Sequence, residues 1–141
     1  MNKIKIVPID QLNQTASTTL MGSLGIRFTR ISEEELEATM PVDHRTHQPF
    51  GILHGGASVA LAETLGSVGA NLCIDNKEFH CVGLEINANH ISSVREGTVT
   101  GVARPIHLGR STHVWEIRIT SDQQKLVCIS RITMAIIANK K

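Results

Sequence analysis

One carboxylate in this sequence has surroundings that are otherwise uncharged. Glu63 is the only charged residue between residues 55 and 73, a stretch with the periodicity of a long helix. A carboxylate that loses its hydration there holds a proton more readily, and it can act as a general base or a nucleophile near neutral pH. The alternative is a structural glutamate that hydrogen-bonds to neighbouring strands.

The start of the same helix offers a second candidate group. In His54-Gly55-Gly56, the first backbone N–H groups of the helix have no internal partner and carry partial positive charge. Glycines let a ligand approach these donors, which suits the oxyanion that forms when a thioester carbonyl is attacked. The alternative is a plain helix entry that His54 caps. Gln48, in the preceding loop, carries an amide that can donate to the same oxygen.

The two candidate groups lie too far apart on one helix to act on the same bond. Gly55 and Glu63 are eight residues apart, which is about 12 Å along a helix that rises about 1.5 Å per residue. Both groups must come within roughly 3 Å of the reacting atoms. We therefore expect a composite site, in which Gly55 of one chain acts with Glu63 of a second chain across a two-fold axis.

The sequence lacks the residue patterns of a metal site, a serine nucleophile elbow and a phosphate-binding loop. His44, His47 and His54 could cluster, but no HxH or HExxH spacing accompanies them. The GxSxG nucleophile elbow and the phosphate-binding P-loop are also absent. The sequence therefore predicts no metal site.

Composition and charge exclude several classes of protein. A length of 141 residues with 41% apolar residues predicts a single globular domain over residues 1–141. A formal net charge of +1, with few aromatic side chains, argues against a nucleic-acid partner. No run approaches a membrane span of about 18 apolar residues, and we expect a cytoplasmic protein with no membrane partner. The three cysteines show no CxxC spacing and indicate reduced, mostly buried thiols.

The helix that carries both candidates must occupy the centre of the fold. Its apolar stripe predicts packing against a sheet, and small residues on the opposite face permit close approach of a ligand or another backbone. Because no charged face exists, we expect this helix to be buried nearly all round. The stripe is Leu61, Leu65, Val68 and Leu72, and the opposite face is Gly56, Ala60, Glu63, Ser67 and Ala70.

Alternating patterns place strands around this helix. A shorter helix is predicted over residues 9–22 with Asp10 as its N-cap, and residues 43–53 form an ordered loop. Long strands and one buried helix indicate an antiparallel sheet of the α+β class, whose open edges favour oligomerisation. The strands are predicted at residues 25–31, 35–42, 82–89, 97–105, 113–120 and 125–138, with a turn at 122–124.

Together these segments resemble a known family. The run from His47 to Ser67 is similar to that of the hotdog-fold acyl-coenzyme A thioesterases, and the similarity continues through residues 36–42, 82–90 and 106–110. The group it resembles is the 4-hydroxybenzoyl-coenzyme A thioesterase-like (phenylacetate-pathway type) family. Within that group the resemblance is to bacterial enzymes that act on 1,4-dihydroxy-2-naphthoyl-coenzyme A in menaquinone synthesis, or on misloaded aryl carriers in enterobactin synthesis.

The resemblance implies a fold, an activity and a set of residues. It implies a hotdog fold, with an antiparallel sheet wrapped around one long buried helix, that hydrolyses an acyl-coenzyme A or acyl-carrier thioester with an aryl or small acyl group. Glu63 would be the nucleophile or general base, the Gly55 N–H would polarise the carbonyl, and Gln48 and His54 would line the site. Further implied substrate contacts are Ser67, Phe50, Gly83, His90, Ser92, Ser93, His107, Gly109, Arg110 and Ser111.

The resemblance also implies partners and leaves rivals open. Coenzyme A belongs to the substrate, so no separate cofactor is expected, and the family is usually a homotetramer, a dimer of dimers. Relatives typically carry arginine where this chain has Ser92, which weakens nucleotide anchoring unless Arg95 or Arg110 compensates. The rivals are a hotdog hydratase or dehydratase, in which histidine would be the base, and a non-catalytic acyl-thioester binding protein.

Overall fold

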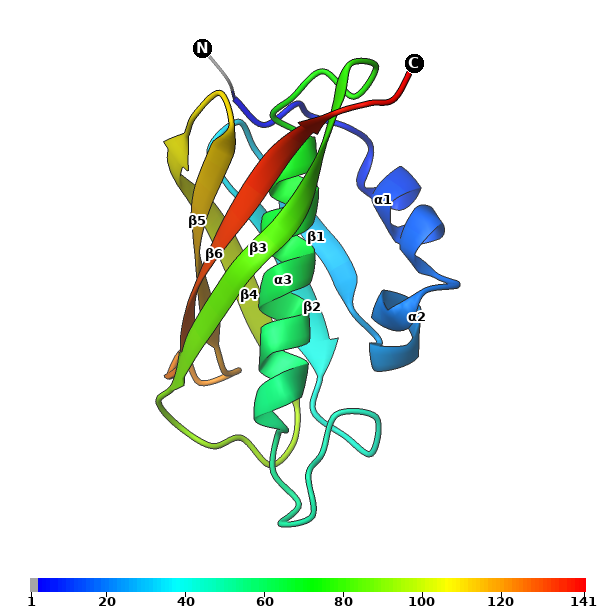
Figure 1. The fold of residues 1–141 in the computed structure, drawn as a ribbon. Helices are drawn as coiled ribbons and strands as arrows, with labels where there is room; N and C mark the ends of the chain where they lie inside the picture. Colours follow the sequence, from blue (N-terminus) through cyan, green and yellow to red (C-terminus); the bar gives the residue numbers. More distant parts are fainter. Residues whose placement is uncertain (1–2) are drawn as a thin grey trace.

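The computed structural model describes residues 3–141 as one antiparallel sheet with a long helix lying along one of its faces (Figure 1). The elements in chain order are α1 (Ile9–Ala16), α2 (Leu20–Leu24), β1 (Arg27–Ile31), β2 (Leu36–Pro41), α3 (Gly55–Asn71), β3 (Phe79–His90), β4 (Thr98–Leu108), β5 (Thr112–Thr120) and β6 (Leu126–Ala138).

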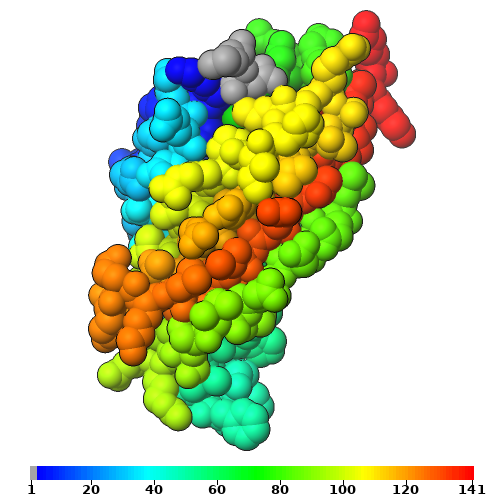
Figure 2. Space-filling model, turned by 90° about the vertical axis from the view of Figure 1, so that its left-hand side faces the viewer, coloured from blue at the N-terminus to red at the C-terminus, as the bar shows by residue number. Residues whose placement is uncertain are grey.

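The sheet has six strands in the order β1-β2-β4-β5-β6-β3, and every neighbouring pair is antiparallel. After β2 the chain leaves the sheet, passes through α3, and returns as β3 on the opposite edge. Figure 2 shows the face turned away from α3, where the strands succeed one another diagonally from cyan and yellow through orange to green. The predicted α+β arrangement is therefore confirmed.

The helix α3 packs closely on the sheet because two of its glycines face large side chains. A Cβ atom added to Gly66 would lie 2.5 Å from Ile132 of β6, and one added to Gly69 would lie 2.8 Å from Trp115 of β5. Such contacts leave no room for a larger residue at either position. The fully buried side chains at this interface include Leu61, Leu65, Trp115, Ile117, Ile119 and Ile132.

The N-terminal helix is shorter than predicted and is broken in two. Thr19 is extended, with φ −112° and ψ −177°, so α1 ends at Ala16 and α2 begins at Leu20. The Ser17 and Thr19 hydroxyls hydrogen-bond to nearby carbonyl groups, which competes with continued helix. The prediction of Asp10 as N-cap is wrong: the cap position is Pro8, and Asp10 lies in the first turn, where its charge favours the helix dipole.

The prediction that α3 is buried nearly all round is wrong for a single chain. The sheet covers Leu61 and Leu65, but Gly56 and Glu63 on the other side are exposed. The helix also ends at Asn71 rather than at residue 73. The missing charges on this face therefore do not reflect burial within the chain; they mark a surface that the chain leaves uncovered.

The predicted strands exist, and the main differences are at two ends. β3 begins at Phe79, before the predicted residue 82, and β4 continues to Leu108, past the predicted residue 105. The pairing of β4 with β5 shifts register between Pro105 and His107. Because proline has no N–H to donate, the strand passes this point through a bulge, which the alternating pattern does not indicate.

One long edge of the sheet is exposed along β3, as the sequence predicted for the sheet as a whole. Phe79, Val82 and Leu84 are 41%, 39% and 62% exposed, respectively. An apolar edge strand of this length is a natural site for pairing with another chain. Within the described residues, no helix has both the length and the apolar character that crossing a membrane requires.

The polar groups in the core belong to few residues, and His113 is the most unusual of them. Its side chain is fully buried on β5, and neither ring nitrogen has a hydrogen-bond partner within residues 3–141. Burial lowers the pKa of His113 below its ordinary value, and the nearby His107 adds to this effect. By contrast, burial raises the pKa of Cys73 to about 11, so this thiol is unreactive at neutral pH.

We expect the wild type to lose thermal stability when the pH is lowered from about 7.5 to about 5.5. A His113→Leu variant should lose less over the same range. The unfolded chain takes up a proton at His113 near pH 6.5, whereas the folded chain does so only at lower pH. The stability linked to neutral His113 is therefore complete above about pH 6.5 and is lost as the pH falls toward the folded-state pKa. Melting temperatures measured at several pH values test this.

The matched control is His44→Gln, because the His44 side chain is 89% exposed. This variant should keep the wild-type slope of melting temperature against pH. If His113→Leu also keeps that slope, another group controls the acid sensitivity of the fold.

Candidate active site

In the first turn of α3, one backbone donor has no acceptor within the part of the chain that the structure describes. His54 is the N-cap, and its Nδ1 accepts the Gly56 N–H at 2.7 Å. The His54 carbonyl accepts the N–H groups of Ala57 and Ser58 at 3.0 and 3.3 Å. Within residues 3–141 the Gly55 N–H has no such acceptor. Capping by His54 and an open donor at Gly55 therefore coexist, and both interpretations of this sequence are compatible.

Gly55 lines a cavity of about 310 Å³ beside the end of β3, here called the Gly55 cavity. A Cβ atom at Gly55 would lie 2.9 Å from Nε2 of His90, so a larger residue here would displace this exposed ring. The structure thus brings together five of the predicted site residues. The lining residues are Gln48, Ile52, Leu53, Gly55, Ser58, His90, Ile91, Ser92, Ser93 and Val127.

Gln48 lines the Gly55 cavity, and its side-chain NH₂ donates to no other group of residues 3–141. Its side-chain oxygen accepts the Phe50 N–H across a tight turn, in which Gly51 has a positive φ of 74°. Because the oxygen is occupied, the side-chain NH₂ is the group that can donate to a ligand. The Gly55 N–H and the Gln48 amide are therefore two neutral donors at one cavity.

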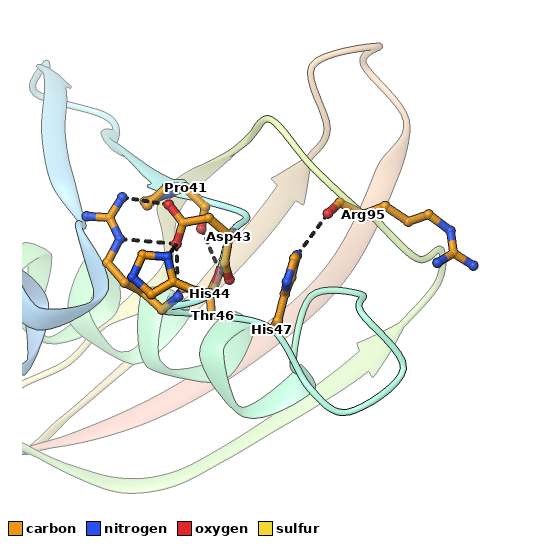
Figure 3. Close-up of polar contacts among 7 residues, drawn as sticks. Pro41, Asp43, His44, Thr46, His47 and Arg95 are labelled. Carbon is orange, nitrogen blue, oxygen red and sulfur yellow. Dashed lines mark hydrogen bonds and ion pairs between the residues drawn. The ribbon is translucent and has the colours of Figure 1, made fainter.

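The loop that carries Gln48 is held by its own hydrogen bonds (Figure 3). Thr46 donates to the Pro41 carbonyl at 2.7 Å, and His47 Nε2 donates to the Arg95 carbonyl at 2.8 Å. Arg45 pairs with Asp43, and its guanidinium keeps the pKa of that carboxyl below its usual range. The loop is thus tied both to the end of β2 and to the segment that leads into β4.

Glu63 lies in a different cavity, here called the Glu63 cavity, of about 540 Å³. A Cβ atom at Gly83 would lie 2.9 Å from Oε1 of Glu63, so this glycine makes room for the carboxylate. Glu63 and Ser67 are among the few polar groups in a wall that is mostly apolar. The lining residues are Thr19, Leu20, Met21, Gly56, Val59, Ala60, Glu63, Thr64, Ser67 and Val68.

Two residues of α2 are also part of this wall, and the sequence did not indicate their contribution. Leu20 and Met21 close one side of the Glu63 cavity, and Leu20 is 65% exposed. Their contribution follows from the break at Thr19, which turns α2 toward α3. The only sequence signal was the run of serine and threonine residues that interrupts the predicted helix.

The structure does not bring all predicted site residues together in one chain. Gly55 and Glu63 open into separate cavities, and His54 lines a third, on the side of Leu24 and Ala60. Phe50 is 84% exposed at the loop tip and lines none of these three cavities. His107 lies near the end of β4, and Gly109, Arg110 and Ser111 form the β4–β5 connection, at the end of the molecule far from the start of α3 (Figure 1).

The arrangement suits attack on a carbonyl group. Neutral donors at the positive end of a helix can stabilise a developing oxyanion, and a carboxylate in an apolar wall can act as base or nucleophile. Within residues 3–141 no group of three or more histidine, cysteine, aspartate or glutamate side chains is placed to hold a metal ion.

Comparison with known proteins gives consistent similarities. Residues 50–128 match the model of a family described as the thioesterase superfamily. The chain is 52% identical over 131 residues to 1,4-dihydroxy-2-naphthoyl-CoA hydrolase of Escherichia coli (strain K12), covering 93% of this chain and 96% of that protein. It is 51% identical over 129 residues to the proofreading thioesterase EntH of Cronobacter turicensis, covering 91% and 93%.

Solved structures show the same relationship. The crystal structure of a mutant of thioesterase PA1618 from Pseudomonas aeruginosa has a TM-score of 0.96 and 52% identity, covering 99% of this chain and 100% of that chain. Thioesterase HI1161 from Haemophilus influenzae has a TM-score of 0.93 and 50% identity, covering 98% and 96%.

We expect His54→Ala to lower the free energy of unfolding by about 1 kcal/mol, because the Gly56 N–H loses its side-chain acceptor. His54→Asn is the matched variant, since an asparagine oxygen can cap the same donor. Urea unfolding at one protein concentration measures both. Equal losses in the two variants would show that the imidazole contributes through some contact other than the cap.

Proposed function

The chain belongs to the thioesterase superfamily, has the hotdog fold and hydrolyses acyl thioesters, and from this premise we propose that Gly55 and Glu63 carry the reaction at a site shared by two chains. The observation that carries the proposal is the geometry of α3. The open N–H of Gly55 and the carboxylate of Glu63 belong to one helix, yet they face separate cavities.

In the proposed reaction the thioester oxygen accepts hydrogen bonds from the Gly55 N–H and the Gln48 amide. These donors stabilise the negative charge that develops on the oxygen when the carbonyl carbon is attacked. The helix dipole acts in the same direction, because its positive end lies at Gly55. His54 has the supporting role of capping the helix, and in doing so leaves the Gly55 donor free.

Glu63 supplies the attack in one of two ways. As a general base it would take a proton from water, whose oxygen then bonds to the carbonyl carbon while the carbon–sulfur bond breaks. As a nucleophile its oxygen would bond to the carbonyl carbon while the carbon–sulfur bond breaks and the thiolate leaves to take up a proton, and water would then hydrolyse the resulting acyl anhydride. Both routes yield a carboxylic acid and a free thiol, and both place the carboxylate beside the carbonyl carbon.

A second copy of the chain would complete the site. The Gly55 cavity of one chain would face the Glu63 cavity of its partner across a two-fold axis, so that each dimer holds two equivalent sites. The uncovered face of α3 and the exposed apolar edge of β3 support such a dimer. Association of two dimers into a tetramer extends this proposal. The β4–β5 connection, with Arg110, would then be available to contact substrate held by another chain.

The substrate we propose is an acyl-coenzyme A or acyl-carrier thioester with an aryl or small acyl group. The Escherichia coli relative is named as a hydrolase of 1,4-dihydroxy-2-naphthoyl-CoA, which supports an aryl group. The apolar wall of the Glu63 cavity, with Val59 and Val68, suits such a group. Hydrolysis needs only water as the second reactant, so the proposal includes neither metal nor separate cofactor.

We expect Glu63→Gln to lower kcat by at least about 100-fold, because the amide is neither base nor nucleophile. We expect Gly83→Ala to lower kcat by about tenfold, since the added Cβ would lie 2.9 Å from Oε1 of Glu63 and displace the carboxylate. Release of free thiol from benzoyl-CoA measures both variants.

The control is Gly101→Ala, whose Cβ would lie 2.7 Å from Leu65 in the core. This variant should lose stability by overpacking, whereas Gly83→Ala should keep its melting temperature because a flexible carboxylate can move. Full activity in both Glu63→Gln and Gly83→Ala would refute the proposed role of the carboxylate.

We expect activity to return when two inactive variants exchange subunits. Glu63→Ala and Gly55→Val each disable both sites of their own dimer. A mixed dimer has one site with native Gly55 and native Glu63, and therefore half of the wild-type activity. Random reassembly makes about half of the dimers mixed, so the mixture should recover about a quarter of wild-type activity.

Subunit exchange itself must be shown independently, for example by mass spectrometry of differently labelled chains. If exchange is complete and no activity returns, the site lies within one chain. The control is a mixture of Glu63→Ala with Glu63→Gln, in which no dimer contains a native site.

A further inference from the structure

The wall of the Glu63 cavity that lies across from Glu63 is built by α2. Glu63 lies on the β3 side of α3, next to Gly83. The short helix α2 lies beside the other flank of α3, on the side of β1 (Figure 1). An acyl group that enters the cavity from Glu63 therefore crosses the open face of α3 and meets Leu20 and Met21.

A second cavity lies on the other side of Leu20. It is the cavity that His54 lines, here called the Leu24 cavity, and its volume is about 280 Å³. It shares three residues with the Glu63 cavity, which are Leu20, Gly56 and Ala60. Gly56 has no side chain and Ala60 has only a methyl group, so Leu20 is the only bulky side chain among the three. Truncation of this one side chain would therefore join the two cavities.

The backbone at Leu20 is held in place, although the side chain itself is 65% exposed. Before α2, the Thr19 hydroxyl donates to the Ala16 carbonyl at 2.6 Å. After α2, the Ile26 N–H donates to the Met21 carbonyl at 2.9 Å. These bonds keep the side chain of Leu20 at the boundary between the cavities. Because that side chain contributes little to the core, a smaller residue here should leave the fold intact.

The Leu24 cavity can receive an apolar chain, because its polar side chains are already bonded within the protein. Arg45 is paired with Asp43, and the side chains of Thr46 and His47 donate to backbone carbonyl groups at 2.7 and 2.8 Å. Leu24 and two alanines of α3 supply the apolar part of the wall. Each methylene that a ligand buries against such a wall strengthens its binding by roughly fourfold.

We propose that Leu20 determines specificity in this thioester hydrolysis by limiting the length of the acyl group. This inference rests on the proposed function, which places the thioester carbonyl beside Glu63. With leucine at position 20, an acyl group that crosses α3 ends at α2, which favours aryl and short acyl groups. With a smaller residue there, a longer unbranched chain continues past α2 into the Leu24 cavity.

The test compares the wild type with Leu20→Ala on benzoyl-CoA and on the straight-chain hexanoyl-, octanoyl- and decanoyl-CoA. Release of free thiol gives kcat/KM for each ester. The variant loses a contact with the benzoyl group and gains room for the end of the decanoyl chain. The ratio of kcat/KM for decanoyl-CoA to kcat/KM for benzoyl-CoA should therefore rise at least about tenfold, and the increase should grow with chain length.

Three further variants separate the size of Leu20 from other effects of α2. Leu20→Met keeps a side chain of similar volume and should keep the wild-type ratio. Leu24→Ala enlarges the Leu24 cavity without opening the boundary, and should also keep that ratio. In the double variant Leu20→Ala with Leu24→Phe, the added ring occupies the Leu24 cavity, so the ratio should return toward the wild-type value.

Two results would overturn the inference. If the ratio is unchanged in Leu20→Ala, the end of a long chain does not reach α2. If the values of kcat/KM for all four esters change by the same factor, Leu20 affects the site as a whole and sets no length limit. Leu20→Val, a smaller truncation, should give a smaller increase in the same direction, and it keeps the test available if Leu20→Ala does not fold.

The test also separates this inference from the proposed function. If the wild type hydrolyses none of the four esters, the proposed function fails for acyl-coenzyme A substrates. Calorimetric titration with decanoate then decides the length limit alone. Leu20→Ala should bind decanoate at least about tenfold more tightly than the wild type does, and equal binding or none overturns the inference.

Discussion

The packing of α3 on the sheet determines where Gly55 and Glu63, the two central groups of the proposed reaction, lie. Gly66 and Gly69 let the helix approach Ile132 and Trp115 so closely that its rotation about its own axis has little freedom. With one side held in this way, Glu63 lies beside the edge strand of the sheet, next to Gly83 of β3. The same helix therefore belongs to the core on one side and to the site on the other.

The sequence was most informative where one physical signal had one explanation. The long helix, the antiparallel strands and the Gly-rich helix start follow from periodicity and from unsatisfied N–H groups, and the structure agrees with each. The His54 cap and an open donor at Gly55 are compatible, because a cap on Gly56 does not occupy the Gly55 N–H. The resemblance to thioesterases added the residues that spacing alone does not connect, such as His90 beside Gly55.

The sequence was least informative where one signal had two explanations. A helix face without charges can be covered by its own chain or left open for another molecule, and the pattern around Glu63 is the same in both cases. The open face at Gly56 and Glu63 belongs to the second case within this chain. The break at Thr19 and the continuation of β4 beyond Pro105 depend on the backbone conformation of single residues. A periodic pattern of apolar residues carries no information about such positions. These are also the places where α2 reaches the Glu63 cavity and where the β4–β5 connection begins.

The position of β3 in the sheet has a consequence for how the protein is made. β3 pairs only with β6, and Phe79 lies opposite Ala138, near the end of the chain. During synthesis β3 must wait, unpaired and apolar, until the last strand has emerged, and such non-local pairing forms slowly. Gly83 and His90 are carried by this strand. Until β6 is available, the unpaired β3 can associate with other chains, and Gly83 and His90 are not yet held beside α3.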